Sequence, residues 1–195
     1  MFKPSSMDLI RAGLQDLDRA RALFGQLKAD AIADGRCAEL LGVLAHACDP
    51  DVALGNFVDI VNAMQSSRRD LDRVIPDAGA LRRLITVLGA SDEMGKFMRF
   101  RPELVEAASV GSADSHLFNR AQRRARLLMA VGADPDDQAM PVASKDLAEA
   151  ATALRAGYRR QLAAIIAQDV MAEDPIRIQP TISSELSDLA DAALE

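Results

Sequence analysis

Residues 144–172 are the stretch that most limits how this chain can fold. Seven apolar side chains recur there at intervals of three or four residues: Leu147, Ala151, Leu154, Tyr158, Leu162, Ile166 and Val170. This spacing predicts one apolar stripe on a long α-helix, while Gln161 and Ala163 fall toward the opposite side. Ser144 suits the N-cap, and Asp174 before a proline suits the end. A helix roughly 40 Å long needs neighbouring helices to cover its stripe.

The composition favours helices throughout. Hydrophobic residues make up 49% of the 195 residues but aromatic residues only 4%, a balance that suits packed helices better than sheets. We predict an all-α fold, an irregular array of about seven to nine helices with one long central helix. The net charge of −6 disfavours broad binding to nucleic-acid phosphates. No apolar run approaches the roughly 20 residues that would span a membrane, and the N-terminus lacks signal-peptide features.

Several side chains predict where helices begin and end. Four polar residues suit N-cap positions: Ser5, Asp49 (before Pro50), Asp77 and Ser91. The first of these helices is expected to run from Ser5 or Ser6 toward Ile32. Gly89 is predicted to close the helix that Asp77 opens, in the left-handed conformation that glycine tolerates. Further helical segments are predicted at 71–75, 103–107 and 115–131, with a loop at 110–115.

The predicted organisation has three parts. Residues 1–132 form an N-terminal helical bundle, residues 133–143 form a linker rich in proline and aspartate, and residues 144–195 hold the long helix and a connector helix. Within the last part, the proline-bounded segment 175–180 is expected to be extended, with Thr181 capping the final helix. That final helix is still amphipathic at Glu195, so the sequence is expected to continue into a further domain.

The two cysteines, Cys37 and Cys48, are predicted to share one helix about 16 Å apart along its axis. That distance is too long for a disulfide. We interpret both as small buried hydrophobic residues of a protein in a reducing cytoplasm.

The motifs that would carry chemistry are absent. His46 and His116 stand alone, whereas a metal site needs three or four ligands. Asp134, Asp136 and Asp137 resemble the start of a calcium loop, but the glycine and glutamate of such a loop are missing. Phosphate-binding glycine loops and nucleophile elbows are also absent. The sequence therefore predicts no catalytic, cofactor-binding or metal-binding residue.

The densest basic cluster comprises Arg120, Arg123, Arg124 and Arg126. These side chains spread over more than one helix face and no aromatic residues interleave with them, so a solvated helix face is favoured over nucleic-acid binding. Tyr158, the only tyrosine, is expected to pack in the core with its hydroxyl at the rim, rather than to serve as a modification site.

Specific blocks of sequence point to a family. They are residues 81–95 (LRRLITVLGASDEMG), 100–104 (FRPEL), 154–170 (from LRAGYRRQL to QDV) and 185–194 (ELSDLADAAL), with DPDVAL at 49–54. Together they resemble the N-terminal helical portion of bacterial glutamine synthetase adenylyltransferases, over roughly residues 40–107 and 147–195. Arg101 stands where the family usually has histidine, and two methionines replace more usual leucines.

The resemblance implies a large bifunctional enzyme with two polymerase-β-type nucleotidyltransferase domains. One removes AMP from a tyrosine of glutamine synthetase by phosphorolysis, and the other adds AMP from ATP. Mg²⁺ and ATP are the implied cofactors of that parent enzyme, and none is expected in this portion. Glutamine synthetase and a nitrogen-signal regulatory protein are the implied partners. A cytoplasmic location is implied, with neither nucleic acid nor membrane as a partner.

The catalytic motif of that family, a glycine turn followed by Ser-Asp-x-Asp, is not reached. Ser187, Asp188 and Asp191 resemble it faintly, but they fall on a predicted helix without a glycine turn. We expect a chain truncated before the first nucleotidyltransferase domain that acts as a non-catalytic helical scaffold. The alternative is a free-standing cytoplasmic helical module for protein interaction.

Overall fold

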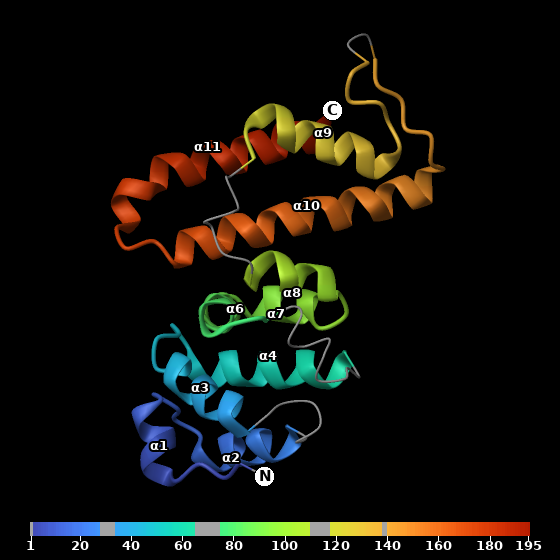
Figure 1. Ribbon diagram of the computed structural model, residues 1–195. Coiled ribbons are helices and arrows are strands. Elements are labelled where there is room, and N and C mark those ends of the chain that lie inside the picture. The colour runs from blue at the N-terminus through green and yellow to red at the C-terminus, as the bar shows by residue number, and fades with distance from the viewer. Residues whose placement is uncertain (1, 28–33, 65–74, 110–117, 138–139) are drawn as a thin grey trace. The chain divides into compact units, whose positions relative to one another are not determined.

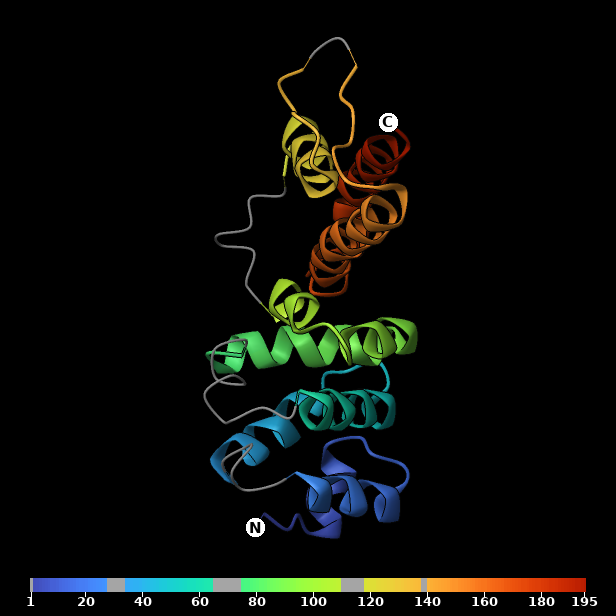
Figure 2. The same ribbon diagram turned by 90° about the vertical axis from the view of Figure 1, so that its right-hand side faces the viewer.

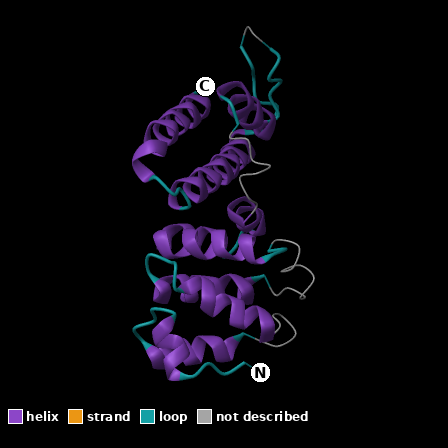
Figure 3. Cartoon of the chain, turned by 60° about the vertical axis from the view of Figure 1, so that its left-hand side comes forward, coloured by secondary structure: helices purple, strands orange, loops and turns teal. Residues whose placement is uncertain are grey.

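A computed structural model describes residues 2–27, 34–64, 75–109, 118–137 and 140–195. In these ranges the chain forms ten helices and no strand (Figure 3). The predicted all-α fold is confirmed, with somewhat more helices than expected. The chain divides into two compact units, Met1–Gly111 and Ser112–Glu195. We call them unit 1 and unit 2 and describe each by itself.

Unit 1 is built from short helices stacked around a central one. The helices in its described ranges are α1 Ser6–Arg11, α2 Leu17–Gln26, α3 Asp34–Leu44, α4 Pro50–Ala63, α6 Ala78–Ala90, α7 Asp92–Met98 and α8 Pro102–Ser109. Helix α4 contacts α2, α3, α6 and α7. Two views at right angles show α4 between α6 and the α1–α2 pair (Figure 1; Figure 2).

The predicted N-caps of unit 1 are confirmed. Ser5, Asp49, Asp77 and Ser91 each accept a hydrogen bond, through the side chain, from the backbone N–H three residues further on. Each bond satisfies an amide that the first turn of a helix leaves unpaired. Asp8 completes a capping box at Ser5 by accepting from the backbone N–H of Ser5 at 3.0 Å.

Several boundaries in unit 1 differ from the prediction. The first predicted helix is two helices, because the chain turns at Gly13 with a φ of 79° that suits glycine. Helix α3 ends at Leu44, so Cys48 lies outside it and is exposed, and only Cys37 is buried. Gly89 is helical and buried, and does not end α6. A Cβ there would lie 2.9 Å from the Cβ of Ala47, so close packing explains this glycine.

The described part of unit 2 contains three helices, α9 Arg120–Val131, α10 Leu147–Val170 and α11 Pro175–Leu194. Each packs against the other two (Figure 1). Helix α9 therefore lies with α10 and α11, whereas the sequence grouped residues 1–132 as one bundle. The reason is that the buried residues of α9 find their partners on α10 and α11. The predicted linker, 133–143, joins α9 to α10 inside unit 2, and its described part contains no helix.

The segment 175–180 is helical, and the predicted extended connector is wrong. Asp174 caps α11 by accepting from the backbone N–H groups of Ile176 and Arg177, and Pro175 occupies the first turn, where its missing N–H is harmless. Thr181 therefore lies inside the helix. Pro180 also lies inside α11, at the expense of one backbone hydrogen bond.

The long helix is confirmed, but its predicted stripe is only partly correct. Asp146, not Ser144, caps α10, and Leu147 at its start is 87% exposed. Gln161 and Ala163, assigned to the solvent side, are buried. Since α9 and α11 both contact α10, its buried surface spans a wider arc than one stripe.

Other predicted segments fall outside the described residues. These are most of the turn at 71–75, the loop at 110–115, and the start of the helix at 115–131, which the structure describes from Arg120 onward.

Candidate functional site

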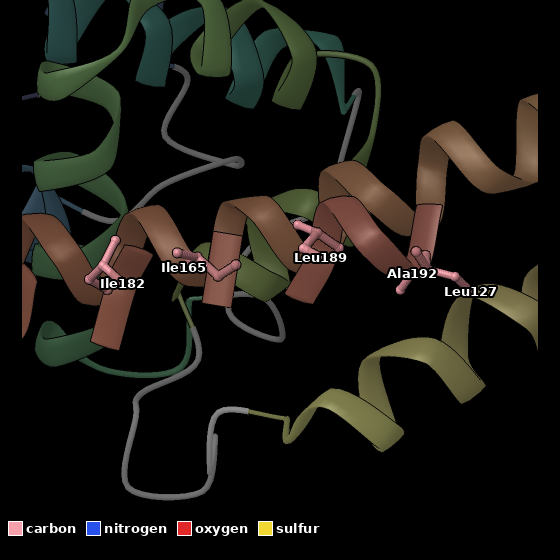
Figure 4. Packing of buried hydrophobic residues seen from close by; sticks show 5 residues of the cluster. All are labelled: Leu127, Ile165, Ile182, Leu189 and Ala192. Atoms are coloured by element: carbon pink, nitrogen blue, oxygen red, sulfur yellow. The ribbon is translucent and has the colours of Figure 1, made fainter. Parts of the chain in front are cut away.

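The centre of unit 2 is a small apolar cluster with a polar layer beside it. Leu127 of α9, Ile165 of α10, and Ile182, Leu189 and Ala192 of α11 form the buried cluster (Figure 4). Leu154, Tyr158 and Leu162 of α10 pack against it while remaining partly exposed. Tyr158 thus packs against the core, as predicted, although its burial is only partial.

The polar layer consists of Arg123 from α9, Gln161 from α10 and Glu185 from α11, which are 1%, 5% and 7% exposed. Nη2 of Arg123 lies 3.0 Å from Oε2 of Glu185. Arg123 also donates from Nη1 to Oε1 of Gln161 at 3.4 Å, and Gln161 donates back to the backbone carbonyl of Arg123 at 3.4 Å. Each helix of unit 2 therefore contributes one polar side chain to the layer.

Electrostatic forces in this layer are opposed. Burial lowers the pKa of Arg123, and the carboxylates of Glu185 and Asp188 act the other way. Burial raises the pKa of Glu185, which the charge of Arg123 only partly offsets, and nearby Asp188 raises it further. Neither Oε2 of Glu185 nor Nη2 of Arg123 has a well-aligned hydrogen bond. Loss of hydration and attraction between the charges therefore act against each other in this pair.

Two more arginines of α9 reach carboxylates of α11 at the rim. Arg120 lies 3.1 Å from Asp191 and 3.9 Å from Asp188. Arg124 donates to both carboxylate oxygens of Glu195, at 2.5 and 2.6 Å, and to the backbone carbonyl of Pro135 at 3.1 Å. From the Arg120–Asp191 pair to the Arg124–Glu195 pair, the contact moves four residues toward the C-terminus on both sides of the seam. Helices α9 and α11 therefore run parallel.

The arginine cluster is therefore not a solvated face as a whole. Arg123 is buried, Arg120 and Arg124 are ion-paired, and the guanidinium of Arg126 lies 3.7 Å from the ring centroid of Phe118. The sequence-based interpretation failed here because the partners are carboxylates far along the chain.

An open groove of about 760 Å³ lies along this seam. Its lining combines arginines and carboxylates with three apolar residues: Arg120, Ala121, Arg124, Asp188, Asp191, Ala192, Leu194 and Glu195. The lining holds three carboxylates and two arginines, and each arginine lies beside a carboxylate, so most of the charge of the groove is already paired.

The residues that faintly resemble a metal motif do not fit a metal. Asp188 and Asp191 both face the guanidinium of Arg120, and Ser187 donates to the backbone carbonyl of Ser183 within α11. A cation there would lie beside an arginine. Over the described residues, no group of three or more histidine, cysteine or acidic side chains could hold a metal ion.

Other candidates have ordinary surroundings. His46 is exposed, and His116 lies outside the described residues. Asp134 accepts from the backbone N–H of Asp136 at 2.9 Å, a local turn contact. In the part of the chain that the structure describes, no helix is long and apolar enough to cross a membrane.

Sequence reasoning missed Gln161 and Glu185. A signal for Glu185 was present, because it follows Ile178 and Ile182 and precedes Leu189 and Ala192 at intervals of four and three residues. A glutamate in such a series stands where the buried face of a helix is expected.

The chain matches known proteins closely over its whole length. It is 80% identical, over all 195 residues, to the bifunctional glutamine synthetase adenylyltransferase/adenylyl-removing enzyme of Bifidobacterium longum. Enzymes of the same name from Cutibacterium acnes and Leifsonia xyli are 33% and 35% identical over 187 residues, which cover 95% and 96% of this chain. No family model matches the chain, and no solved structure matches it.

These alignments cover only a small share of each relative. The chain spans 18% of the Bifidobacterium longum and Cutibacterium acnes enzymes and 17% of the Leifsonia xyli enzyme. The chain therefore belongs to the family of bifunctional glutamine synthetase adenylyltransferase/adenylyl-removing enzymes, and it corresponds to one segment of these enzymes.

Proposed function

We propose that this chain is a non-catalytic helical scaffold within an enzyme that reversibly transfers AMP to and from a tyrosine of glutamine synthetase. The observation that carries the proposal is the 80% identity over all 195 residues to an enzyme of that name. The whole enzyme would use ATP and Mg²⁺, would respond to a nitrogen-signal regulatory protein, and would work in the cytoplasm.

The chemistry of unit 2 supports a non-catalytic role. Nucleotidyl transfer needs carboxylates gathered around a metal that bridges the phosphates. Asp188 and Asp191 are engaged with Arg120 instead, and Glu185 is buried against Arg123. These side chains hold helices together, so the metal and nucleotide would be bound by residues outside this segment.

The packing of α11 supports a scaffold role. Its apolar side chains lie in the core cluster, Glu185 joins the polar layer, and Asp188, Asp191 and Glu195 meet arginines of α9. The helix is thus held at its core and along its rim, which suits an element that fixes the position of neighbouring parts of a larger enzyme.

The test compares three polypeptides in two assays. One measures transfer of labelled AMP to glutamine synthetase, and the other measures phosphorolytic removal of AMP from glutamine synthetase. The polypeptides are this chain, the full-length natural enzyme, and the full-length enzyme with Glu185→Leu. We expect no transfer by this chain alone, both activities in the full-length enzyme, and weaker activity in the variant. Magnesium-dependent transfer by this chain would overturn the proposal.

The size of the natural protein distinguishes the scaffold from the alternative, a free-standing interaction module. An antibody against this chain should detect a polypeptide several times larger in a cell extract, as the 18% coverage of the relatives implies. A natural product of only 195 residues would favour the interaction module.

A further inference from the structure

Buried and partly buried residues of unit 2 follow a seven-residue pattern on two helices. On α11 they are Ile178, Ile182, Glu185, Leu189 and Ala192, at alternating gaps of four and three. On α10, the partly buried Leu154 and Tyr158 and the buried Gln161 and Ile165 show the same alternation, and the small buried residues Ala163 and Ala167 lie outside it. This is the spacing of core positions in coiled coils, where facing helices meet in successive layers.

One of these layers is polar on all three helices. Arg123, Gln161 and Glu185 meet through contacts of 3.0 to 3.4 Å, while the neighbouring positions are apolar. A repeat of seven residues lets a helix slide by one repeat, about 10 Å, and still bury an apolar residue in each layer. Apolar layers alone therefore do not define one axial position for α11.

The polar layer makes one axial position of α11 more favourable than the others. A slide of α11 by one repeat would bring Ile178 or Ala192 opposite Arg123 in place of Glu185. The guanidinium, 1% exposed, would then be buried without its carboxylate, which is strongly unfavourable. In coiled coils, a single buried polar residue is known to fix register in this way, at some cost in stability.

We propose that Arg123, Gln161 and Glu185 form a register-determining layer, which selects one axial position of α11 on the α9–α10 pair. The rim pairs of Arg120 and Arg124 are compatible with the selected position but do not select it, because both are more exposed to solvent than the Arg123–Glu185 pair and an exposed ion pair contributes less. The inference concerns the fold of unit 2 and is independent of the proposed enzymatic role.

The test measures the distance between spin labels on α9 and α11 in the full 195-residue chain. Met129→Cys and Ile176→Cys provide the sites, since these side chains are 56% and 87% exposed. The native cysteines are first replaced, by Cys37→Ala and Cys48→Ser. We expect one narrow distance distribution in this background.

The decisive variant replaces the layer with leucine, in Arg123→Leu/Gln161→Leu/Glu185→Leu. We expect a helical protein by circular dichroism, with a distribution that broadens or gains a second maximum displaced by about 10 Å. The reversed pair, Arg123→Glu/Glu185→Arg, should restore the single maximum, because the amide of Gln161 can both donate and accept. Asp191→Asn at the rim is the matched control, and its distance distribution should also keep a single maximum.

The outcomes that overturn the proposal are distinct. A single unchanged maximum in the leucine variant would show that the apolar layers suffice to set the register. Loss of helicity in that variant would show that the layer supplies stability and not register. A second maximum in Asp191→Asn would assign the register to the rim pairs, and failure of the reversed pair to restore one maximum would refute the charge complementarity.

Discussion

Unit 1 and unit 2 hold helices together with different side chains. In unit 1, α4 and α6 bury leucine, isoleucine, valine and phenylalanine, and the buried polar residues described there are the neutral Asn56, Thr86 and Ser109. In unit 2, three helices share a small apolar cluster and bury Arg123 against Glu185. A core of the first kind is specified by shape, whereas one of the second kind is also specified by charge.

The difference has an energetic consequence. Burial of an apolar side chain contributes on the order of 1.5–3 kcal/mol to folding, so each of the many core residues of unit 1 adds stability. A buried ion pair contributes little net stability, but removal of one partner is costly. We therefore expect unit 2 to be less stable than its helix length suggests, and to be sensitive to changes at a few charged positions.

The largest expected effect is that of Glu185→Leu. It leaves Arg123 buried without its carboxylate, which should lower the free energy of unfolding of unit 2 by about 3–5 kcal/mol. Urea unfolding can be followed by tyrosine fluorescence, since Tyr158 is the only tyrosine, the chain has no tryptophan, and Tyr158 packs against the core of unit 2. Such a local probe is needed because a two-unit chain has no single unfolding free energy.

Two controls sharpen this result. Asp191→Asn removes an exposed pair and should cost about 1 kcal/mol or less. The double variant Arg123→Met/Glu185→Leu removes both buried charges and should recover the lost stability. If Glu185→Leu costs no more than Asp191→Asn, the contrast between the two units is refuted.

A smaller effect is expected at a glycine of unit 1, where shape should decide. In Gly95→Ala the new Cβ would lie 2.3 Å from Cγ of Asn56, whose amide donates to the backbone carbonyl of Leu88 at 3.3 Å. Displacement of that side chain should cost about 1–3 kcal/mol. Native-state hydrogen exchange of α4 and α7 amides measures this loss.

Gly42→Ala in α3 is the matched control. No atom lies within 4 Å of the Cβ that it would add, so the higher helix propensity of alanine should stabilise α3 by about 1 kcal/mol. Equal effects of the two substitutions would show that α7 can move away from α4 without cost.

The features that the sequence predicted correctly are local. An N-cap at Asp49 or Asp77 depends on an amide three residues away, so the residues that decide it are adjacent in the sequence. Repeated apolar spacing likewise indicated the long helix, although not the breadth of its buried surface. The all-α fold followed from these local signals together.

Some of the misses were local, such as the helical start of α11 at Asp174, but two others depend on residues far apart in the chain. Gly89 has the sequence context of a helix end, but the approach of Ala47 explains its presence. Arg123 has the context of a solvated arginine cluster, and its burial requires Glu185 from another helix. The polar layer could not be assembled from one helix at a time, and for this reason unit 2 was less predictable than unit 1.

The smallest expected effect is a difference in how the two units respond to pH. In unit 1, hydrogen bonds from the hydroxyl and backbone N–H of Ser5 lower the pKa of Asp8 below its ordinary value of 3.8. Its contribution to stability is present above that value and is lost as the pH falls below it. In unit 2, burial raises the pKa of Glu185 above its ordinary value of 4.5. The folded state then binds the proton more tightly, so the contribution of Glu185 is complete below about pH 4.5 and is lost as the pH rises through the raised pKa.

Tyrosine fluorescence should therefore report a free energy of unfolding of unit 2 that decreases as the pH rises from 4.5. Helix α1 of unit 1 should show no such decrease by hydrogen exchange. Glu185→Gln removes the titrating group and should abolish the slope in unit 2. Arg124 lowers the pKa of Glu195, so that group acts in the opposite direction, but only at lower pH. The measurement decides between two opposed forces at Glu185, burial and attraction to Arg123. If the free energy of unfolding of unit 2 increases as the pH rises from 4.5, attraction to Arg123 outweighs burial. The core of unit 2 would then gain stability from its charges.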